Sequence, residues 1–449
     1  MLLDLLNSRF LIHSERNAVV ENGKTFSYKD LNTQVDEWAV RTDVLGISAG
    51  TVVGVQSDFS YQTIALLISL FRKGCVVAFI SSSAKQVERY CEEAFVEYLF
   101  VQEEEGLASK HVGLAGRKRH ELLCELERKK RSGFIIFSSG TTGRPKAILH
   151  DLEKFLSSFE SANKSFRTLA FLLLDHIAGI DTLFYSLYSG GCLVLASSRT
   201  PRNICGLISC HKIEVLPVSP SFLNLLILSS EHEEFDLSSL EIITYGSEPM
   251  SDAVLKKLPL IFPDTIILQK YGTSEFGSPR SKTREGDTSW IKLDSPNFQT
   301  KVSGGVLWVK SSSTMVGYLN ADGMLESEGW LCTGDLVEVD NGWLRFIGRE
   351  TDIINVGGEK VFPVEVESVV NEVETVDDCA VFGEVHALLG NQVCVKIRCG
   401  SEVDTKLLKK AIRKHCICSL ERYKVPSKFE FTSSSLVNSR HKKQRGGHK

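Results

Sequence analysis

Short β-branched runs alternate with helical patterns through the middle of the chain, and this alternation constrains the fold more than any other feature. Lys212–Pro220 ("KIEVLPVSP") is typical of a strand and precedes the helix-like stretch "SFLNLLILSS". Glu241–Pro249 and Thr265–Gly272 predict two further strands, and Ser251 can cap the helix "DAVLKKL" between them. Such alternation favours an α/β architecture with largely parallel sheets.

The pattern changes near residue 340. Leu336–Asp340 ("LVEVD") and Trp343–Ile347 ("WLRFI") flank Asn341-Gly342, a strong hairpin signal. A smaller mixed segment follows, with a predicted helix near 363–373, two strands, and a second helix over 404–416. We therefore predict an N-terminal α/β domain over residues 1–350 and a small α+β domain over residues 351–449. The tail "NSRHKKQRGGHK" has the composition of a locally disordered segment.

Composition excludes several functional classes. The 449 residues carry a net charge of -4, so no global field recruits nucleic acid or anionic membrane. The longest apolar runs, such as Thr63–Phe71, are too short to span a bilayer. The 12 cysteines include no C-x-x-C pair, which favours buried thiols in a reducing cytoplasm over a disulfide framework or a zinc site.

The stretch "FIIFSSGTTGRPKAILHD" (Phe134–Asp151) places glycines, hydroxyls and a lysine between two apolar runs. A P-loop needs Ser or Thr directly after its lysine and then a helix, whereas here a strand-like "AILH" follows, which excludes a P-loop kinase. The pattern predicts a strand, a loop and a second strand. The loop can cradle a polyphosphate with backbone N–H groups and hydroxyls, although a polar surface turn would look the same. The candidate phosphate-binding residues are Ser138, Ser139, Gly140, Thr141, Thr142, Gly143 and Lys146.

Two further stretches carry candidate site residues. "KYGTSEFG" (Lys270–Gly277) follows a predicted strand, at the end where α/β proteins bind ligands. Glu275 is a candidate Mg²⁺ ligand there, because Mg²⁺ favours one or two carboxylates plus substrate phosphates. A two-residue hairpin loop pairs Asp340 with Trp343, and counting outward sets Asp335 opposite Gly348. Asp335 and Arg349 then meet at the open end, as a salt bridge or as a grip on the two hydroxyls of a ribose.

Together these residues resemble the acyl-adenylate-forming superfamily of acyl-CoA synthetases, peptide-synthetase adenylation domains and luciferases. The motifs occur in order along nearly the whole chain: "FSYKDL", "SSGTTGRPKA", "YGSEPMS", "YGTSE", "GVLWVKSSSTMVGYLN", "GWLCTGD" and "GRETDIINVGGEKVFP". The resemblance implies a large N-terminal domain of α/β subdomains, a mobile C-terminal domain and a two-step reaction. A carboxylate attacks the α-phosphate of Mg-ATP to give acyl-AMP and pyrophosphate, and a thiol then takes the acyl group.

The resemblance also assigns roles to residues. It implies that the loop from Ser138 to Lys146 holds the β- and γ-phosphates and that Gly246, Ser247 and Glu248 lie along one face of adenine. Tyr271 is implied on the other face, beside Gly272. Thr273 would contact phosphate, Glu275 would bind Mg²⁺, and Asp335 and Arg349 would hold the ribose.

Two positions depart from the family pattern. The C-terminal lysine that bridges carboxylate and α-phosphate usually follows a glycine, whereas here Lys442 lies in "RHKKQR" with His441 before it. Its spacing to Arg445 identifies Lys442 as the counterpart, while adjacent Lys443 and a simple solvated basic tail stay as alternatives. The hinge position, commonly Asp or Lys in the family, is Thr351.

The acid and its acceptor are less constrained. Leu172–Phe184 ("LLLDHIAGIDTLF") resembles the segment that lines the acyl pocket, with His176 at a position that is often aromatic. Ile177 follows where amino-acid-activating relatives carry an aspartate, which argues against an α-amino acid. Asp175 and Asp181 flank the segment, and either could face the pocket or not.

With Tyr245 and Phe222 as further substrate-binding candidates, we expect an aromatic or short-to-medium hydrophobic acid. The expected acceptor is coenzyme A, with a phosphopantetheinyl carrier protein as the rival. A non-catalytic adenylate-binding relative is the alternative of another class.

Overall fold

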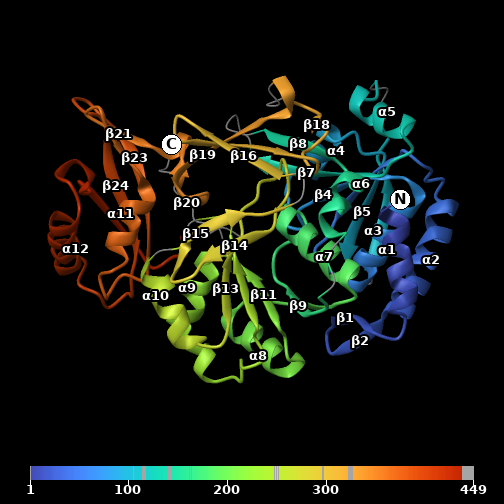
Figure 1. The fold of residues 1–449 in the computed structure, drawn as a ribbon, viewed down its shortest axis with the longest axis horizontal. Helices are drawn as coiled ribbons and strands as arrows, with labels where there is room; N and C mark the ends of the chain where they lie inside the picture. The colour runs from blue at the N-terminus through green and yellow to red at the C-terminus, as the bar shows by residue number, and fades with distance from the viewer. Residues whose placement is uncertain are drawn as a thin grey trace.

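The computed structural model describes residues 2–104, 106–113, 118–139, 144–160, 162, 164–246, 248, 250, 252–295, 298–321 and 327–436. Four β-sheets organise these residues. Figure 1 shows the N-terminal segments (blue) at one end of the molecule and the C-terminal segments (red) at the other, with the middle of the chain between them. The mixed α/β class predicted from the sequence is confirmed.

The first sheet has the strand order β13-β12-β11-β9-β10-β1-β2. All neighbours pair in parallel except the edge strand β2, so the predicted parallel sheet is confirmed here. Hydroxyl caps start its helices where strands end; Ser219, for example, accepts a hydrogen bond from Phe222 N directly after β11. The strands are β1 (Asn17–Glu21), β2 (Lys24–Ser27), β9 (Arg167–Ala170), β10 (Cys192–Leu195), β11 (Val215–Val218), β12 (Ile242–Tyr245) and β13 (Ile266–Gln269).

Four helices connect the strands of the first sheet: α7 (Ile177–Ser189), α8 (Pro201–His211), α9 (Pro220–Ser229) and α10 (Asp252–Ile261). The strands and helices predicted between residues 212 and 272 are all present. The proposed cap of α10, Ser251, lies outside the described residues. The apolar sides of β11 and β12 and of helices α8 and α9 form one buried cluster, which fixes the carboxyl ends of the strands in space.

The second sheet has the order β18-β8-β7-β4-β3-β5-β6 and mixes parallel and antiparallel neighbours. Its central helix α3 (Tyr61–Lys73) is buried along most of its length, which explains why it is apolar all round, and it ends at Gly74 with a φ of 87°. The strands are β3 (Val52–Gln56), β4 (Val76–Ile80), β5 (Tyr98–Glu103), β6 (Gly106–His111), β7 (Gly133–Ser139), β8 (Pro145–Asp151) and β18 (Gly317–Tyr318). The other helices are α1 (Leu2–Ile12), α2 (Tyr28–Val44), α4 (Val87–Glu93), α5 (Glu121–Arg128) and α6 (Leu152–Leu156).

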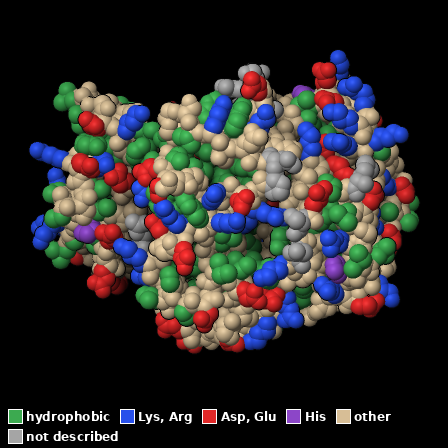
Figure 2. Space-filling view, viewed as in Figure 1, with side chains coloured by type: hydrophobic (Ala, Val, Ile, Leu, Met, Phe, Trp, Pro, Cys, Tyr) green, Lys and Arg blue, Asp and Glu red, His purple; other side chains and the backbone are tan. Residues whose placement is uncertain are grey.

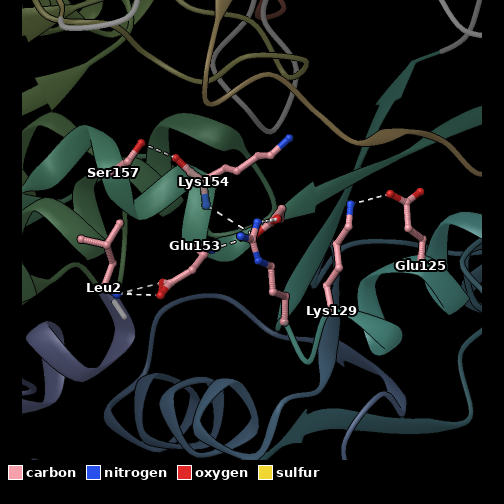
Figure 3. A network of polar contacts seen from close by, with 8 residues as sticks. Leu2, Glu125, Lys129, Glu153, Lys154 and Ser157 are labelled. Atoms are coloured by element: carbon pink, nitrogen blue, oxygen red, sulfur yellow. Dashed lines mark hydrogen bonds and ion pairs between the residues drawn. The ribbon is translucent and has the colours of Figure 1, made fainter.

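A network of polar contacts anchors the carboxyl end of β8 (Figure 3). Asp151 caps α6 and pairs with Arg131 at 2.5 Å. The next acidic residue, Glu153, accepts hydrogen bonds from the backbone N–H groups of Leu2, at 2.6 Å, and Leu3, at 3.3 Å. These N–H groups have no partner within helix α1, so Glu153 satisfies them and favours the positive end of the helix dipole. The hairpin of β7 and β8 is therefore held at the end opposite its loop.

The third sheet is antiparallel, with the order β14-β15-β20-β19-β17-β16, and lies between the other parts of the chain (Figure 1). Sequence analysis predicted only its central hairpin. Asn341 and Gly342 have φ values of 50° and 81°, as a two-residue hairpin loop of this type requires. The strands are β14 (Ser281–Arg284), β15 (Asp287–Leu293), β16 (Phe298–Ser303), β17 (Val306–Ser311), β19 (Leu331–Asp340) and β20 (Trp343–Arg349).

The fourth sheet belongs to the C-terminal segment, and the short 3₁₀ turn η4 (Glu350–Asp352) connects it to β20. Its two helices cover an apolar core, and Asn224 of α9 donates a hydrogen bond of 3.0 Å to the carbonyl of Asp377 across to this segment. The domain boundary near residue 350 stays a prediction. The elements are β21 (Ile354–Val356), β22 (Glu359–Val361), α11 (Pro363–Val370), β23 (Asp378–His386), β24 (Gly390–Arg398), α12 (Thr405–Ser419) and β25 (Lys428–Thr432).

Candidate active site

Two cavities meet at the carboxyl end of β13, on either side of the strip Lys270-Tyr271-Gly272. The first cavity, called the nucleotide cleft after the role expected from the sequence, is lined by Asp335, by residues of β20, and by Asp352, Phe362, Pro363 and Val364 of the C-terminal segment. The second cavity, called the acyl cavity for the same reason, lies against helix α7 and the ends of β11 and β12. In Figure 2, Lys and Arg side chains and apolar side chains gather near the middle of the face where the strands of the third sheet meet the first sheet.

The two strands that flank the hydroxyl-rich loop, β7 and β8, pair as an antiparallel hairpin, as the sequence predicted. Ser138 of β7 is registered opposite Lys146 of β8, and a helix begins only at Leu152. This order of elements agrees with the exclusion of a P-loop. Candidate residues Gly140, Thr141, Thr142 and Gly143 lie outside the described residues, as does the side chain of Ser139.

A chain of contacts joins this hairpin to the candidate magnesium carboxylate. The Lys146 ammonium lies 5.2 Å from the centre of the Tyr318 ring. The Tyr318 hydroxyl donates a hydrogen bond of 3.1 Å to Glu275 Oε1. Burial, followed by the charge of Glu275, raises the pKa of Tyr318, so its hydroxyl keeps its proton and acts as a donor. Sequence analysis assigned no role to Tyr318, although it lies in the quoted "GYLN" motif.

The loop that carries Thr273 and Glu275 is tightly folded. Thr273 N–H donates to the Gly277 carbonyl at 3.1 Å and Gly277 N–H donates to the Thr273 carbonyl at 3.0 Å. A Cβ on Gly272 would lie 2.4 Å from the Gly277 oxygen, so only glycine fits there. The Glu275 carbonyl accepts from Met315 N–H at 2.7 Å, which ties the loop to the segment before β18.

His150 also contacts the loop that carries Thr273 and Glu275. Its Nε2 lies 2.7 Å from the Ser274 carbonyl, and its ring stacks on Phe134 with centroids 4.7 Å apart. Burial lowers the pKa of His150 to about 4, so the ring is neutral at physiological pH. Because a carbonyl oxygen only accepts, the proton of the neutral ring is on Nε2. Sequence analysis did not find this contact, which joins residues 124 positions apart.

Asp335 and Arg349 meet as predicted, but by a different register. The structure pairs Asp335 directly with Arg349 and Leu336 with Gly348, whereas counting from the turn had set Asp335 opposite Gly348. Val337 pairs with Phe346, but the next residue, Leu336, pairs with Gly348. Ile347 between them is unpaired and forms a bulge, which shifts the register by one residue. Arg349 Nε donates to Asp335 Oδ1 at 3.0 Å.

Tyr271 completes this cluster. Its hydroxyl donates to Asp335 Oδ2 at 2.7 Å, and Phe346 stacks on one face of its ring at a centroid distance of 4.2 Å. A nucleotide base could therefore stack only on the opposite face. Burial raises the pKa of Asp335, while the Arg349 charge and the Tyr271 hydroxyl act in the opposite direction. The carboxylate thus has two donors even before a ligand arrives.

The acyl cavity brings together several predicted substrate residues. His176 caps α7 by accepting from Ala178 N–H at 3.4 Å, and His176, Tyr245 and Gly246 all line the cavity. Phe222 does not line it: this side chain is fully buried behind Phe171, with ring centroids 4.4 Å apart. Of the two flanking aspartates, Asp181 lines the cavity and Asp175 does not.

The remaining candidates divide between the two regions and the undescribed residues. Glu248 lines the nucleotide cleft and accepts a hydrogen bond of 3.1 Å from Ser221 N–H. Ser247, Lys442 and Lys443 lie outside the described residues. Over the part of the chain that is described, no group of three or more His, Cys, Asp or Glu is placed to hold a metal ion. Glu275 is therefore a single carboxylate, which suits a cation that takes its other ligands from phosphate and water.

Fold and site together define an acyl-adenylate-forming enzyme. The chain belongs to the AMP-binding enzyme family, whose model matches residues 11–319, and the model of the AMP-binding enzyme C-terminal domain matches residues 365–443. Among curated proteins it is similar to acyl-CoA synthetase 7 of Caenorhabditis elegans, at 26% identity over 96% of this chain and 93% of the relative. It is also similar to 2-succinylbenzoate–CoA ligase of Bacillus pumilus, at 27% identity over 97% of this chain and 95% of the relative.

A solved structure shares the fold. The anthranilate CoA ligase AuaEII in complex with anthranoyl-AMP superimposes with a TM-score of 0.85 at 21% identity, over 99% of this chain and 95% of that chain. Within the described ranges, no helix is both long and apolar enough to cross a membrane. All 12 cysteines are free thiols, and most are buried.

Proposed function

We propose that this chain is an acid–thiol ligase that uses Mg-ATP to convert a small carboxylic acid into acyl-AMP and then into a coenzyme A thioester. The carboxylate oxygen forms a bond to the α-phosphorus while the bond from that phosphorus to the pyrophosphate oxygen breaks. A thiol, which loses its proton, then attacks the acyl carbon, and AMP leaves. The two relatives with nearly full coverage are named as CoA ligases or synthetases, which supports this class of reaction.

The observation that carries the proposal is the meeting of two unlike cavities at one strip of chain. The nucleotide cleft offers a ribose-binding pair, an aromatic ring and a carboxylate, and the acyl cavity has a mostly apolar wall. An acid in one and a nucleotide in the other would meet at Tyr271 and Gly272. That arrangement is what an acyl-phosphate bond between the two substrates requires.

We assign the site residues as follows. Asp335 and Arg349 hold the ribose hydroxyls, and Tyr271 stacks on the base opposite Gly246, Ser247 and Glu248. Thr273 and the loop from Ser138 to Lys146 bind the phosphates. Lys442 bridges the reacting carboxylate and the α-phosphate, where its charge would stabilise the transition state. His176 and Tyr245 contact the acid, and Phe222 shapes the wall from behind Phe171.

The residues present fit Mg²⁺ bound between Glu275 and the phosphates. The Tyr318 hydroxyl orients Glu275 by a hydrogen bond, and His150 fixes the loop by its hydrogen bond to the Ser274 carbonyl. A bound Mg²⁺ would neutralise phosphate charge. Lys146, beside the same tyrosine ring, adds a second positive charge on the phosphate side.

The acyl cavity has room for a small acid. Its volume of about 100 Å³ does not exceed the roughly 150 Å³ of an engineered cavity that holds one benzene molecule, so we expect at most one ring or a short chain and no long fatty acid. Coenzyme A is the proposed acceptor and a carrier protein its rival. The free, buried thiols suit a reducing compartment, and we propose the cytoplasm.

The test is pyrophosphate release from Mg-ATP with a panel of aryl, short-chain, long-chain and amino acids, each with and without coenzyme A. We expect release with small non-amino acids and faster turnover, with thioester formation, when coenzyme A is present. Adenylation that ignores coenzyme A but transfers to a holo-carrier would move the acceptor to the rival. Bound ATP with no release for any acid would contradict the proposed reaction.

A further inference from the structure

Two charged side chains of opposite sign face the acyl cavity from different elements. Asp181 lies on the second turn of α7, and Lys270 follows β13 at the strip shared by the two cavities. The rest of the lining near them is largely apolar, with Ile177, Ala178 and Val218 among its residues. Charged groups in such a wall are costly unless something pairs with them.

Asp181 has no such pair. In the described part of the chain, its carboxylate accepts no hydrogen bond and makes no ion pair within 4.0 Å. Burial raises the pKa of Asp181 to about 6, and the Lys270 charge acts in the opposite direction without reversing the shift. The carboxylate keeps part of its accessible surface because that surface faces the cavity. A carboxylate turned toward a cavity without donors is a candidate for ligand recognition.

Lys270 is in the same situation. No carboxylate of the described residues lies within 4.0 Å of its ammonium, and the Lys270 charge acts on Asp181 only over a longer distance. The other cation of the lining is already engaged, because Arg199 pairs with Asp58 at 2.7 Å and donates to the Phe171 carbonyl. The Thr182 hydroxyl is engaged too, since it donates to the Ala178 carbonyl at 2.8 Å. Asp181 and Lys270 are therefore the charged groups available to a ligand in this cavity.

We propose that the acid activated by this enzyme carries a hydroxyl group on its acyl part, which donates its proton to Asp181 and accepts a hydrogen bond from Lys270. This inference rests on the proposed function and names its substrate class. A hydroxyl is both donor and acceptor and carries no charge, so it satisfies a pair of opposite charges that do not touch each other. The interaction is charge-assisted on both sides, which makes each hydrogen bond stronger than a neutral one.

Other groups satisfy the pair less well. A second carboxylate would bind Lys270 but meet the charge of Asp181, and an ammonium group would bind Asp181 but meet Lys270. An unsubstituted acid would leave both charges buried without a partner when it displaces water. A site built to hydrogen-bond a hydroxyl rejects an analogue that lacks it, because the buried polar groups are then unpaired.

The experiment compares matched acids in binding and in turnover. The probes are benzoate, its 2-, 3- and 4-hydroxy derivatives, 4-(aminomethyl)benzoate, which carries an ammonium group, terephthalate, and the pair hexanoate and 6-hydroxyhexanoate. Equilibrium binding by calorimetry in the presence of a non-hydrolysable ATP analogue is measured first, and kcat/KM for pyrophosphate release second. We expect one hydroxy acid to bind and react at least 10-fold better than its parent.

Variants connect that preference to the two residues. Asp181→Asn and Lys270→Met should each reduce the hydroxy-to-parent ratio toward one, and the double variant should lose little more because both act on one hydroxyl. The matched controls are Asp294→Asn and Lys282→Met, which break an exposed ion pair of 2.7 Å on the third sheet and should keep the ratio. Thermal unfolding at pH 7.5 shows whether each variant is folded.

The outcomes separate the two proposals. Turnover of parent and hydroxy acids at equal rates, with equal binding, overturns the hydroxyl inference and leaves the ligase proposal intact. A 10-fold preference for terephthalate or 4-(aminomethyl)benzoate overturns it as well. If no acid releases pyrophosphate, the ligase proposal fails, and selective binding of a hydroxy acid that is lost in Asp181→Asn would still support the cavity assignment.

Discussion

The two cavities that meet at Lys270-Tyr271-Gly272 differ in whether their charged side chains have partners. In the nucleotide cleft, Asp335 accepts hydrogen bonds from both Tyr271 and Arg349, so the pair that we propose to bind ribose is held in place by groups of the chain itself. In the acyl cavity, Asp181 and Lys270 have no partner of this kind among the described residues. The first arrangement is preorganised and adds to stability, and the second costs stability until a ligand pairs with it. The comparison separates general nucleotide binding from selection of one acid.

The largest effect is expected from Lys442, which lies outside the described residues. Lys442→Ala should reduce the rate of adenylation at least about 100-fold, because it removes a positive charge that interacts most strongly with the negative charge developing at the transition state. ATP binding measured by calorimetry should be unchanged. Lys443→Ala made in parallel identifies which lysine acts, and full activity of Lys442→Ala would contradict the assignment.

Asp335→Ala should disrupt the preorganised hydrogen bonds of the nucleotide cleft. The variant removes an acceptor for ribose and leaves Arg349 and the Tyr271 hydroxyl without their partner. Because hydrogen bonds to charged groups contribute about 1.5–3 kcal/mol each, we expect kcat/KM for ATP to fall about 100-fold, with little change in acid binding. The control is Glu338→Gln, which removes an exposed ion pair with Arg345 on the same hairpin. An unchanged kcat/KM for ATP would show that the pair does not hold the nucleotide.

Asp181→Asn should show the opposite character of the acyl cavity by stabilising the protein. The pKa of Asp181 is about 6 in the folded state and 3.8 ordinarily, so between these values the unfolded chain releases its proton first and the free energy of unfolding falls as pH rises. We expect the variant to gain about 1–3 kcal/mol at pH 7.5, and the gain to vanish below pH 4. Denaturant unfolding at both pH values measures this.

A surface carboxylate provides the control of opposite sign. A hydrogen bond from Lys129 lowers the pKa of Glu125, so its small contribution favours the folded state above the ordinary value and is lost as pH falls. Glu125→Gln should therefore not stabilise the protein at pH 7.5. If Asp181→Asn and Glu125→Gln changed the free energy of unfolding equally at pH 7.5, the proposed difference between an unpaired carboxylate in the cavity and a paired one on the surface would be wrong.

The smallest effect is expected at Tyr318. Tyr318→Phe keeps the ring beneath Lys146 and removes the hydrogen bond to Glu275, which is worth about 1 kcal/mol. The Mg²⁺ concentration for half-maximal activity should rise about 3- to 10-fold, because the carboxylate loses the group that orients it. The remote variant Tyr423→Phe should leave this Mg²⁺ concentration unchanged. An unaltered Mg²⁺ requirement in Tyr318→Phe would contradict the assignment of Glu275 as a metal ligand oriented by Tyr318.

Structural features that depend on residues adjacent in the sequence could be predicted from the sequence. The strands and helices from residue 212 to 272 follow local patterns, and Asn341-Gly342 fixes a hairpin turn by itself. The meeting of Asp335 with Arg349 followed from that turn. Its register did not, because a bulge such as that at Ile347 is set by the pairing of two whole strands, here β19 and β20, and not by adjacent residues. The antiparallel third sheet was missed for the same reason.

The site divides along the same line. Tyr271 and Glu275 lie in linear motifs and could be named in advance. The contact of His150 with Ser274 and that of Tyr318 with Glu275 join distant segments, and only the folded chain brings them together. Asp181 could be noted in the sequence, but which face of α7 it occupies and the opposing Lys270 are matters of tertiary packing.

The shared strip also has a thermodynamic consequence. Two ligands that touch the same wall bind with reciprocal coupling, so any factor by which ATP raises the affinity for the acid is the factor by which the acid raises the affinity for ATP. Acyl-AMP goes further, since one molecule occupies both cavities and its second half binds at the effective concentration set by a covalent link. The intermediate is then retained far longer than either substrate, which keeps a reactive anhydride away from water until the thiol arrives.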